Sequence, residues 1–371
     1  MKLWKVWSVS GVTLAALCGL LAYDAGCSGG SSSVAGQPPG KPGTQPSTKP
    51  DNVETFAIQT LLLGEYDRTT KTPSTTAWKS YGYNLDGKVT TKDSADVCTA
   101  AVKTNQIDGN NGIDNAFGSV ILPIIQTAAS LQTPSDTISQ AIAGGSFTIQ
   151  IQVKGLDDTA AQTATGLTGQ LFASGAYGGT PAFDATTDWP VTGLLLNNPN
   201  DINSGSKITF SDSYIVNGTF VSGDLSTGGV QVSISLVFQG VPLTLSVNHA
   251  VITFDHTTAN DAANGTIAGV IDTEKLINGL KTVAGRISKS LCGTAFDGIA
   301  QQIRQTSDIL SDGTNKSGVP CDAISVGIGF TAKHVKNPTK VASLGSAPPD
   351  PCSTDGGTTM DSGATDSGGG G

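Results

Sequence analysis

The sequence has little charge and few of the side chains on which enzymes most often depend. Charged residues make up 14% of the 371 residues, histidine occurs 3 times, and glutamate is nearly absent. The formal net charge of −9 leaves no basic stripe that would release counterions from a nucleic acid. We therefore expect no nucleic-acid partner and few candidates for a general acid.

Recognisable catalytic motifs are also missing from the sequence. It contains no Gly-x-Ser-x-Gly elbow and no Gly-Lys-Ser/Thr phosphate-binding loop. His249 and His256 lie on one strand-like run, where a spacing of seven directs them to opposite faces. Four aspartates are the ordinary candidates for a glycosidase acid pair: Asp184, Asp188, Asp212 and Asp255. Whether the protein is an enzyme stays open at this point, and the sequence favours a non-catalytic role.

The first informative feature of the sequence is an export signal at its N-terminus. Lys2 and Lys5 precede an uncharged, mostly apolar run over residues 6–23, and the small pair Ala25-Gly26 follows. This order is typical of a signal peptide, which we place at residues 1–26. If the signal is not cleaved, the apolar run is about long enough to span a membrane.

The residues around Cys27 resemble a bacterial lipobox, in which the cysteine receives a lipid and becomes the mature N-terminus. Asp24 stands where that pattern has an aliphatic residue, so it bears on the efficiency of processing. Ser28 is not the acidic residue linked with retention at the inner membrane. The sequence predicts a lipid-anchored protein of the cell envelope, attached through Cys27 to the outer membrane.

Low-complexity segments border the central part of the chain. Residues 27–52 are rich in Gly, Ser and Pro without an apolar period, and residues 347–371 are acidic and rich in Gly. Such compositions do not bury enough apolar surface to form a core, so we expect a disordered tether and a disordered tail. Residues 53–346 are predicted to form one β-rich domain, with two domains split near 133–146 as the alternative.

Alternation of apolar and polar residues predicts many strands in that domain. The pattern covers residues 147–153, 230–236, 243–247 and 266–271, and Asn217-Gly218 is typical of a tight hairpin. Turn signals recur about every ten residues, which favours an antiparallel β-sandwich or meander. We expect a mainly β fold with two to four packed helices, and an α+β fold is the alternative.

Two helices and a final strand are predicted near the C-terminus. After Asp272, a candidate N-cap, apolar residues recur at spacings of three and four up to about Cys292, and a second helix follows over 296–303. Helices are also expected around 116–131 and after Pro134. In the strand over 324–330 one face carries only Ser325, Gly327 and Gly329, which predicts close packing against that face.

Four cysteines remain outside the signal and the lipobox, an even number that indicates disulfides in an oxidising compartment. No two of them have the close spacing of zinc ligands. We expect a bridge between Cys292 and Cys321, with Cys98 and Cys352 as the candidates for a second one.

The segment over 107–118 is rich in short oxygen-bearing side chains. Asp108, Asn110 and Asp114 are candidate ligands for a structural calcium ion, and the loop is loosely similar to the Asp/Asn/Gly loops of thrombospondin type-3 repeats. It does not match an EF-hand, because glycine and glutamate are not at the required positions. The alternative is an Asn/Gly turn in which Asp114 or Asn115 caps the following helix. Apart from this ion we expect no cofactor.

Aromatic residues offer a further candidate surface: Trp78, Tyr81, Tyr83 and Trp189 could stack against sugars. Aromatic side chains in strands are more often part of the core.

Several short motifs occur in a fixed order between residues 78 and 330. They are a G-x-x-L-D-G turn at 82–87, Cys98, a G-I-D-N-x-x-G loop at 112–118 and a C-x-A-I-S-x-G-I-G-F strand at 321–330. In these motifs the chain resembles Gly/Ser/Thr-rich bacterial envelope lipoproteins without an assigned activity. The resemblance implies an envelope lipoprotein and carries no chemistry.

Taken with the composition, these features predict a non-catalytic surface module. It would bind a polysaccharide or another envelope protein and would contact the membrane through its N-terminal lipid. A carbohydrate-active hydrolase with an Asp-based site remains the alternative.

Overall fold

The computed structural model describes residues 34–102, 104–129, 133–157, 159–223, 225, 229–238, 241–343 and 349–352. These residues belong to one compact unit, Ser31–Gly371. The predicted signal at 1–26, Cys27 and most of the acidic tail lie outside the described residues.

One antiparallel sheet of nine strands dominates the fold, in the spatial order β11-β12-β1-β2-β3-β7-β8-β10-β9. Its strands are β1 (Val53–Leu62), β2 (Ile149–Lys154), β3 (Ala164–Ala173), β7 (Thr209–Val216), β8 (Thr219–Val221), β9 (Val230–Phe238), β10 (Val241–Thr258), β11 (Asp261–Asp272) and β12 (Ala323–Val335). The mainly β prediction is confirmed.

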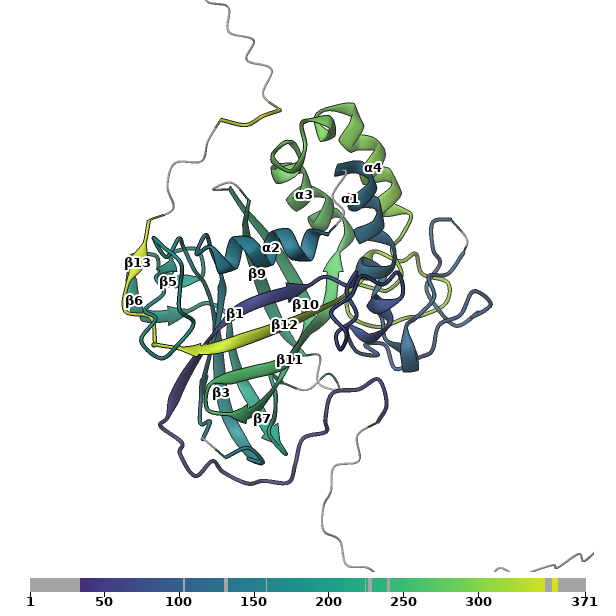
Figure 1. Cartoon of the computed structure of the whole chain (residues 1–371). Coiled ribbons are helices and arrows are strands. Elements are labelled where there is room, and N and C mark those ends of the chain that lie inside the picture. The colour runs from purple at the N-terminus through teal and green to yellow at the C-terminus, as the bar shows by residue number, and fades with distance from the viewer. Residues whose placement is uncertain are drawn as a thin grey trace, which may run out of the picture. The chain divides into compact units, whose positions relative to one another are not determined.

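The sheet closes on itself because β10 is long enough to pair with three other strands. Its first half pairs with β9, and its second half pairs with β8 on one side and with β11 on the other. Since β11 also pairs with β12, the strands from β11 through β1 to β10 form a ring, and β9 extends beyond it (Figure 1). The architecture is therefore a single curved sheet and not two stacked sheets.

Local sequence signals explain several of these strands. The predicted hairpin at Asn217-Gly218 joins β7 to β8, and both turn residues have positive φ angles, 48° and 82°. The alternating runs over 147–153, 230–236, 243–247 and 266–271 lie largely within β2, β9, β10 and β11.

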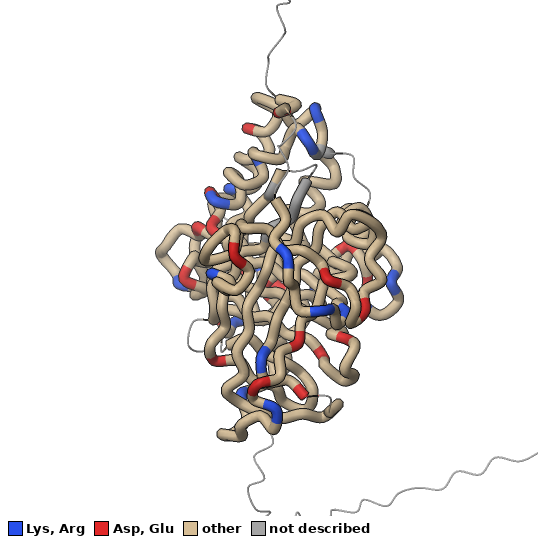
Figure 2. Tube along the Cα trace, turned by 90° about the vertical axis from the view of Figure 1, so that its left-hand side faces the viewer, with Lys and Arg blue, Asp and Glu red and all other residues tan. Residues whose placement is uncertain are grey.

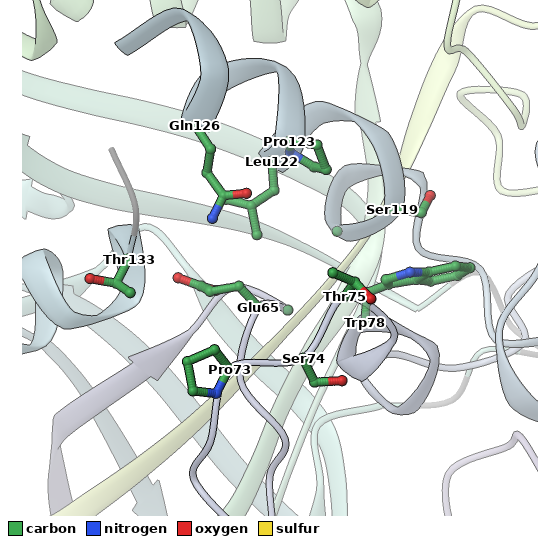
Figure 3. A pocket seen from close by; sticks show the side chains of 12 residues that line it. Glu65, Pro73, Ser74, Thr75, Trp78, Ser119, Leu122, Pro123, Gln126 and Thr133 are labelled. Atoms are coloured by element: carbon green, nitrogen blue, oxygen red, sulfur yellow. The ribbon is translucent and has the colours of Figure 1, made fainter. Parts of the chain in front are cut away.

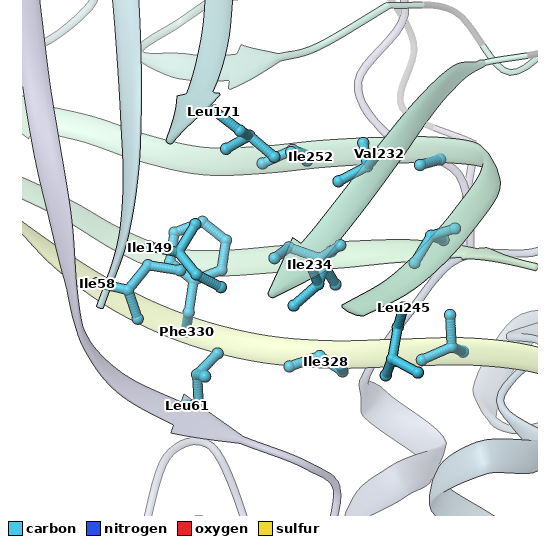
Figure 4. Close-up of a cluster of buried hydrophobic side chains, with 14 of the residues drawn as sticks. Ile58, Leu61, Ile149, Leu171, Val232, Ile234, Leu245, Ile252, Ile328 and Phe330 are labelled. Carbon is cyan, nitrogen blue, oxygen red and sulfur yellow. The ribbon is translucent and has the colours of Figure 1, made fainter. Parts of the chain in front are cut away.

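Apolar side chains from opposite parts of the ring fill its interior. Phe254 on β10 contacts Phe56 on β1 and Phe220 on β8, with ring centroids 5.4 and 4.8 Å apart, and all three are fully buried. Figure 4 shows this core continuing through Ile149 and Ile252 toward the β9–β10 hairpin. Burial of so many large side chains is the main favourable term for a sheet of this size.

Four α-helices gather near the end of the sheet at which β9 and β10 extend (Figure 1). They are α1 (Leu122–Ala129), which continues a π-helical turn at Phe117–Ile121, α2 (Pro134–Ala143), α3 (Thr273–Ile287) and α4 (Thr294–Arg304). Asp272 caps α3 by accepting a hydrogen bond from the Lys275 N–H, as its position predicted. Short strands β4 (Val191–Thr192), β5 (Leu196–Asn198), β6 (Asp201–Ser206) and β13 (Val341–Ala342) form two small additional sheets.

The nearly bare face of β12 is packed as predicted. Tyr81 lies against it and is fully buried. A methyl group at Gly327 would lie 2.2 Å from the Tyr81 carbonyl oxygen, and one at Gly329 would lie 2.2 Å from the Tyr81 ring. No larger residue fits at either position without displacing Tyr81.

The expected bridge between Cys292 and Cys321 is wrong, because the structure joins Cys98 to Cys321 and Cys292 to Cys352. Backbone hydrogen bonds of Thr99 with Val319 and Cys321 place Cys98 beside Cys321. Chain spacing had allowed several pairings, and these long-range contacts select one. Two disulfides indicate an extracytoplasmic protein.

Cys292 instead meets the C-terminal segment on the surface of α3. Gly285 has no side chain, and a methyl group there would lie 2.3 Å from the sulfur of Cys352. The start of the expected disordered tail is thus held by a covalent bond at Cys352.

The expected disordered tether also needs correction in its described part, residues 34–52. The Tyr214 hydroxyl donates to the Pro39 carbonyl at 2.6 Å, and the Thr165 N–H donates to the Gln45 carbonyl at the same distance. An extended, proline-rich segment leaves its carbonyl groups free to accept such bonds. This segment therefore lies along β3 and β7.

Within the described residues, no helix has both the length and the apolar character required to cross a membrane.

Candidate functional site

In the Asp/Asn-rich segment over 107–118, the side chain of Asn115 connects three segments that are distant in the sequence. Asn115 accepts a hydrogen bond from the Gly118 N–H at 2.9 Å, which is the bond expected of a helix N-cap. Its amide nitrogen also donates to the carbonyl oxygens of Trp78, Tyr81 and Gly327. The alternative interpretation of the loop, an Asn cap on the helix that begins at Ala116, agrees with this geometry.

A second chain of hydrogen bonds fastens the same helix start to β12. The Ala116 N–H donates to the Ser325 hydroxyl, which in turn donates to a carboxylate oxygen of Asp308 at 2.5 Å. The Ser325 N–H donates to the other Asp308 oxygen. Two of the short motifs, the loop at 112–118 and the strand at 321–330, therefore meet in one buried network.

Several carboxyl groups share this region. Burial is the main cause that raises the pKa of Asp108 and of Asp308 to about 7, and the negative charge of Asp86 contributes to both shifts. Asp114 is almost fully buried, and burial together with the charges of Asp86, Asp108 and Asp308 raises its pKa well above the ordinary range. The folded protein therefore holds protons on this aspartate cluster (Asp108, Asp114 and Asp308) near neutral pH.

The side chains predicted to bind calcium make hydrogen bonds to other groups of the protein. An Asp108 oxygen accepts from the Thr90 N–H, an Asp114 oxygen accepts from the Leu85 N–H at 2.6 Å, and the exposed Asn110 amide donates to the Ser80 hydroxyl. Across the described ranges, no three Asp, Glu, His or Cys side chains are arranged to hold a metal ion. The ligand set Asp108, Asn110 and Asp114 stays a prediction.

Two buried oxygen atoms beside the cluster lack hydrogen-bond partners, Asn84 Oδ1 and Asp86 Oδ2. Such atoms are uncommon in folded proteins because each one loses its hydration without compensation. They lie on the G-x-x-L-D-G turn, whose backbone N–H groups at Leu85 and Asp86 face Asp114.

The four candidate glycosidase aspartates do not form a pair. Asp184 accepts bonds within its own turn, Asp188 accepts from Thr339, and Asp212 binds Lys41. Asp255 accepts from Thr219 and Asn264. Hydrogen bonds keep the pKa of Asp184 below its usual range, and those from Thr339 do the same for Asp188 against the effect of burial, whereas a general acid needs a raised pKa.

The candidate aromatic residues divide into core and surface. Tyr81 and Trp189 are fully buried, and the hydroxyl of the half-buried Tyr83 hydrogen bonds to Thr253 at 2.7 Å. Trp78 is half-buried and borders a pocket. Of the four, Trp78 is therefore the side chain with access to a ligand.

The pocket beside Trp78 has a volume of about 370 Å³. It lies between the start of α1, the beginning of α2 and the chain that follows β1. Its walls are formed by Gly64, Glu65, Pro73, Ser74, Thr75, Trp78, Gly118, Ser119, Leu122, Pro123, Gln126 and Thr133. In Figure 3, Gln126 and Leu122 extend from α1 toward Glu65 and Pro73, and the Trp78 ring lies at one side.

Two glycines make room for Trp78 at this pocket. A methyl group at Gly118 would lie 2.8 Å from the Trp78 Cβ atom, and one at Gly64 would lie 3.2 Å from it. The Lys79 ammonium lies 5.7 Å from the centre of the Trp78 ring. Gly118 therefore serves both the helix cap at Asn115 and the position of the indole.

Glu65 places a carboxylate in the pocket wall and was not recognised from the sequence. Its two oxygens accept from the N–H and the hydroxyl of Ser135, each at 2.7 Å. The Ser135 hydroxyl accepts in turn from the Leu63 N–H. This arrangement holds the carboxylate at the N-terminal end of α2, where the helix dipole stabilises negative charge. The sequence does contain a signal for this site: Gly64-Glu65 places a turn residue and an acid directly after an apolar run.

The chemistry of this indole pocket, the cavity beside Trp78, suits a ligand with many hydroxyl groups. A carboxylate, an amide and several hydroxyls supply donors and acceptors, and the indole supplies a flat apolar face. The volume lies in the range of small-molecule sites.

Comparisons with known proteins bring no further assignment: no protein-family model, no curated protein and no solved structure matches this chain.

Proposed function

We propose that this protein is a non-catalytic glycan-binding module of the cell envelope, which takes a saccharide into the indole pocket. The observation that carries the proposal is the pairing of Trp78 with Glu65 and Gln126 around one cavity of about 370 Å³. One sugar face packs on the indole, and its hydroxyls bind the carboxylate and the amide.

Two further features support binding over hydrolysis. Glu65 is the one carboxylate in the pocket wall as the structure describes it, and both of its oxygens already accept from Ser135. Acid-base hydrolysis of a glycoside needs two carboxyl groups with different protonation states on opposite sides of the bond. The hydrolase alternative therefore has less support than a binding role.

The proposed cellular context is a lipid anchor at Cys27 in the outer membrane. The two disulfides support an extracytoplasmic location. Lys and Arg positions are dispersed among Asp and Glu positions along the chain (Figure 2), which supports a neutral glycan over a nucleic acid as partner.

A glycan array probed with the full-length protein tests the proposal. The wild type should retain a defined group of oligosaccharides, and Trp78→Ala should weaken their binding roughly tenfold, about 1.4 kcal/mol. Trp78→Phe keeps an aromatic face and is the matched control, because it should preserve most of the affinity. An array pattern that is the same for Trp78→Ala and wild type would contradict the proposal.

A further inference from the structure

An apolar cavity adjoins the indole pocket. It has a volume of about 90 Å³ and lies between α1, α2, α3 and the extended β9–β10 hairpin. One of its lining residues, Thr137, is polar, and the others are Leu63, Phe117, Leu122, Ile125, Pro134, Ile138, Ile234, Leu243, Leu245, Leu276, Leu280 and Ile328. Figure 4 shows Ile234, Leu245 and Ile328 gathered on the sheet side of this region.

A second, smaller apolar cavity lies close to the first along α1. It has a volume of about 20 Å³, shares Ile125 and Leu280 with the first and reaches Phe296 on α4. Both cavities are lined by residues of α1 and α3, and we refer to the two together as the apolar slot. Ile125 is half-buried and Thr137 is exposed, so the slot opens to solvent between α1 and α2.

Water is a poor occupant of the apolar slot, because it would find almost no hydrogen-bonding partners there. Protein interiors seldom keep voids of this size, since the atoms that line them lose their packing contacts. A flexible, unbranched hydrocarbon chain fits a narrow apolar slot and would restore those contacts.

Leu122 joins the two sites. Its side chain lines both the indole pocket and the apolar slot, and the consecutive residues Thr133 and Pro134 line one site each. A polar site with a flat aromatic face and a mostly apolar site thus share one side chain in their walls. This juxtaposition matches an amphiphile whose sugar and hydrocarbon parts are joined directly.

We propose that the ligand is an acylated saccharide, a glycolipid whose sugar occupies the indole pocket and whose acyl chain enters the apolar slot past Leu122. The inference rests on the proposed glycan-binding function and adds the hydrophobic half of the ligand.

The probe for this inference is a series of n-alkyl β-D-glucosides with chains of two to eight carbons, titrated calorimetrically into the full-length protein below their micelle concentrations. Each methylene that enters the slot should tighten Kd about fourfold, until the slot is full. Ile125→Phe fills the slot and should make Kd independent of chain length. Ile124→Phe is the matched control, since the neighbouring Ile124 is also half-buried and lines neither cavity.

The outcomes separate the two proposals. Trp78→Ala should weaken every glucoside by the same factor and leave the gain per methylene unchanged. If Kd does not depend on chain length in the wild type, the glycolipid inference is overturned, while a loss of binding in Trp78→Ala would still support the glycan site. A gain per methylene that persists in Ile125→Phe also overturns the inference, provided that the variant melts as the wild type does. If the chain-length gain is present but Trp78→Ala changes nothing, the sugar does not lie in the indole pocket, and both proposals fail.

Discussion

The side-chain amide of Asn115 pairs with the backbone N–H and carbonyl groups of Gly327, 212 residues further along the chain. Its oxygen accepts from the Gly327 N–H at 3.0 Å, and its nitrogen donates to the Gly327 carbonyl at 3.2 Å. The pair joins the start of the helix that carries Leu122 and Gln126 to the centre of β12. The wall of the indole pocket therefore depends on this contact.

Replacement of Asn115 should be costly. Asn115→Ala removes the side chain that the Gly327 N–H and the carbonyl groups of Gly327 and Tyr81 bind, and each buried unsatisfied group costs about 1–3 kcal/mol. We expect the free energy of unfolding to fall by about 2–4 kcal/mol in urea denaturation. Asn110→Ala, at an exposed position of the same loop, is the control and should change stability by less than about 0.5 kcal/mol. Equal effects of the two substitutions would contradict the role assigned to Asn115.

The close packing of Tyr81 on β12 predicts that Gly327 does not tolerate a side chain. The methyl group of Gly327→Ala would lie 2.2 Å from the Tyr81 carbonyl oxygen. Overpacking of this kind costs typically about 1–3 kcal/mol. Gly298→Ala in α4 is the control, because no atom lies near the new methyl group and alanine favours the helix, so it should stabilise by about 0.5–1 kcal/mol. Thermal unfolding of both variants measures the contrast.

The two disulfides should differ in their contribution to stability. The Cys98–Cys321 bridge spans 223 residues and the Cys292–Cys352 bridge spans 60. The chain-entropy model gives about 5 kcal/mol for the longer loop and about 4 kcal/mol for the shorter one. We expect Cys98→Ser/Cys321→Ser to lower the melting temperature more than Cys292→Ser/Cys352→Ser. Peptide mapping without reduction should recover these two pairs, and a Cys292–Cys321 peptide would contradict the structure.

Stability should decrease as the pH rises from about 5 to about 7. The folded-state pKa values of Asp108, Asp114 and Asp308 lie above the value near 4 of an unfolded aspartate, so in this window the folded state binds more protons. Each such proton contributes a slope of up to about 1.4 kcal/mol per pH unit, and the contributions of Asp108 and Asp308 are complete below pH 4 and lost above about pH 7. Aspartates with lowered pKa values are already ionised above pH 5 and do not mask the trend.

Asp114→Asn tests the origin of this pH dependence. The amide oxygen can still accept from the Leu85 N–H, while the titrating proton is removed. Urea denaturation from pH 5 to pH 8 should show a smaller loss of stability than in the wild type. An unchanged slope would assign the pH dependence to other groups.

The sequence predicted the local features of the fold better than its closure. Asn217-Gly218, the Asp272 cap and the bare face at Gly327 each depend on neighbouring residues, and each prediction is confirmed. The pairing of β10 with β8, β9 and β11 was not predicted, since an alternation of apolar and polar residues does not show which strands pair. β1 was not predicted either, because its pairing with β12 joins segments hundreds of residues apart. The disulfide pairing was wrong for the same reason.

The candidate site shows a similar limit. Trp78 was recognised as a candidate aromatic surface, but Glu65 was not, since only α2 brings Ser135 to its carboxylate. The calcium loop was chosen on composition, which does not show that Asp114 faces the backbone at Leu85 and that Asn110 faces solvent.

The most direct test of the account is the NMR signal of the Trp78 indole N–H during titration of the full-length protein with an oligosaccharide retained on the array. Trp189 is the internal reference, because its indole is fully buried and donates to the Gly175 carbonyl. We predict a saturable shift of the Trp78 signal with no change at Trp189. Saturating binding that leaves the Trp78 signal unmoved would contradict a saccharide site in the indole pocket.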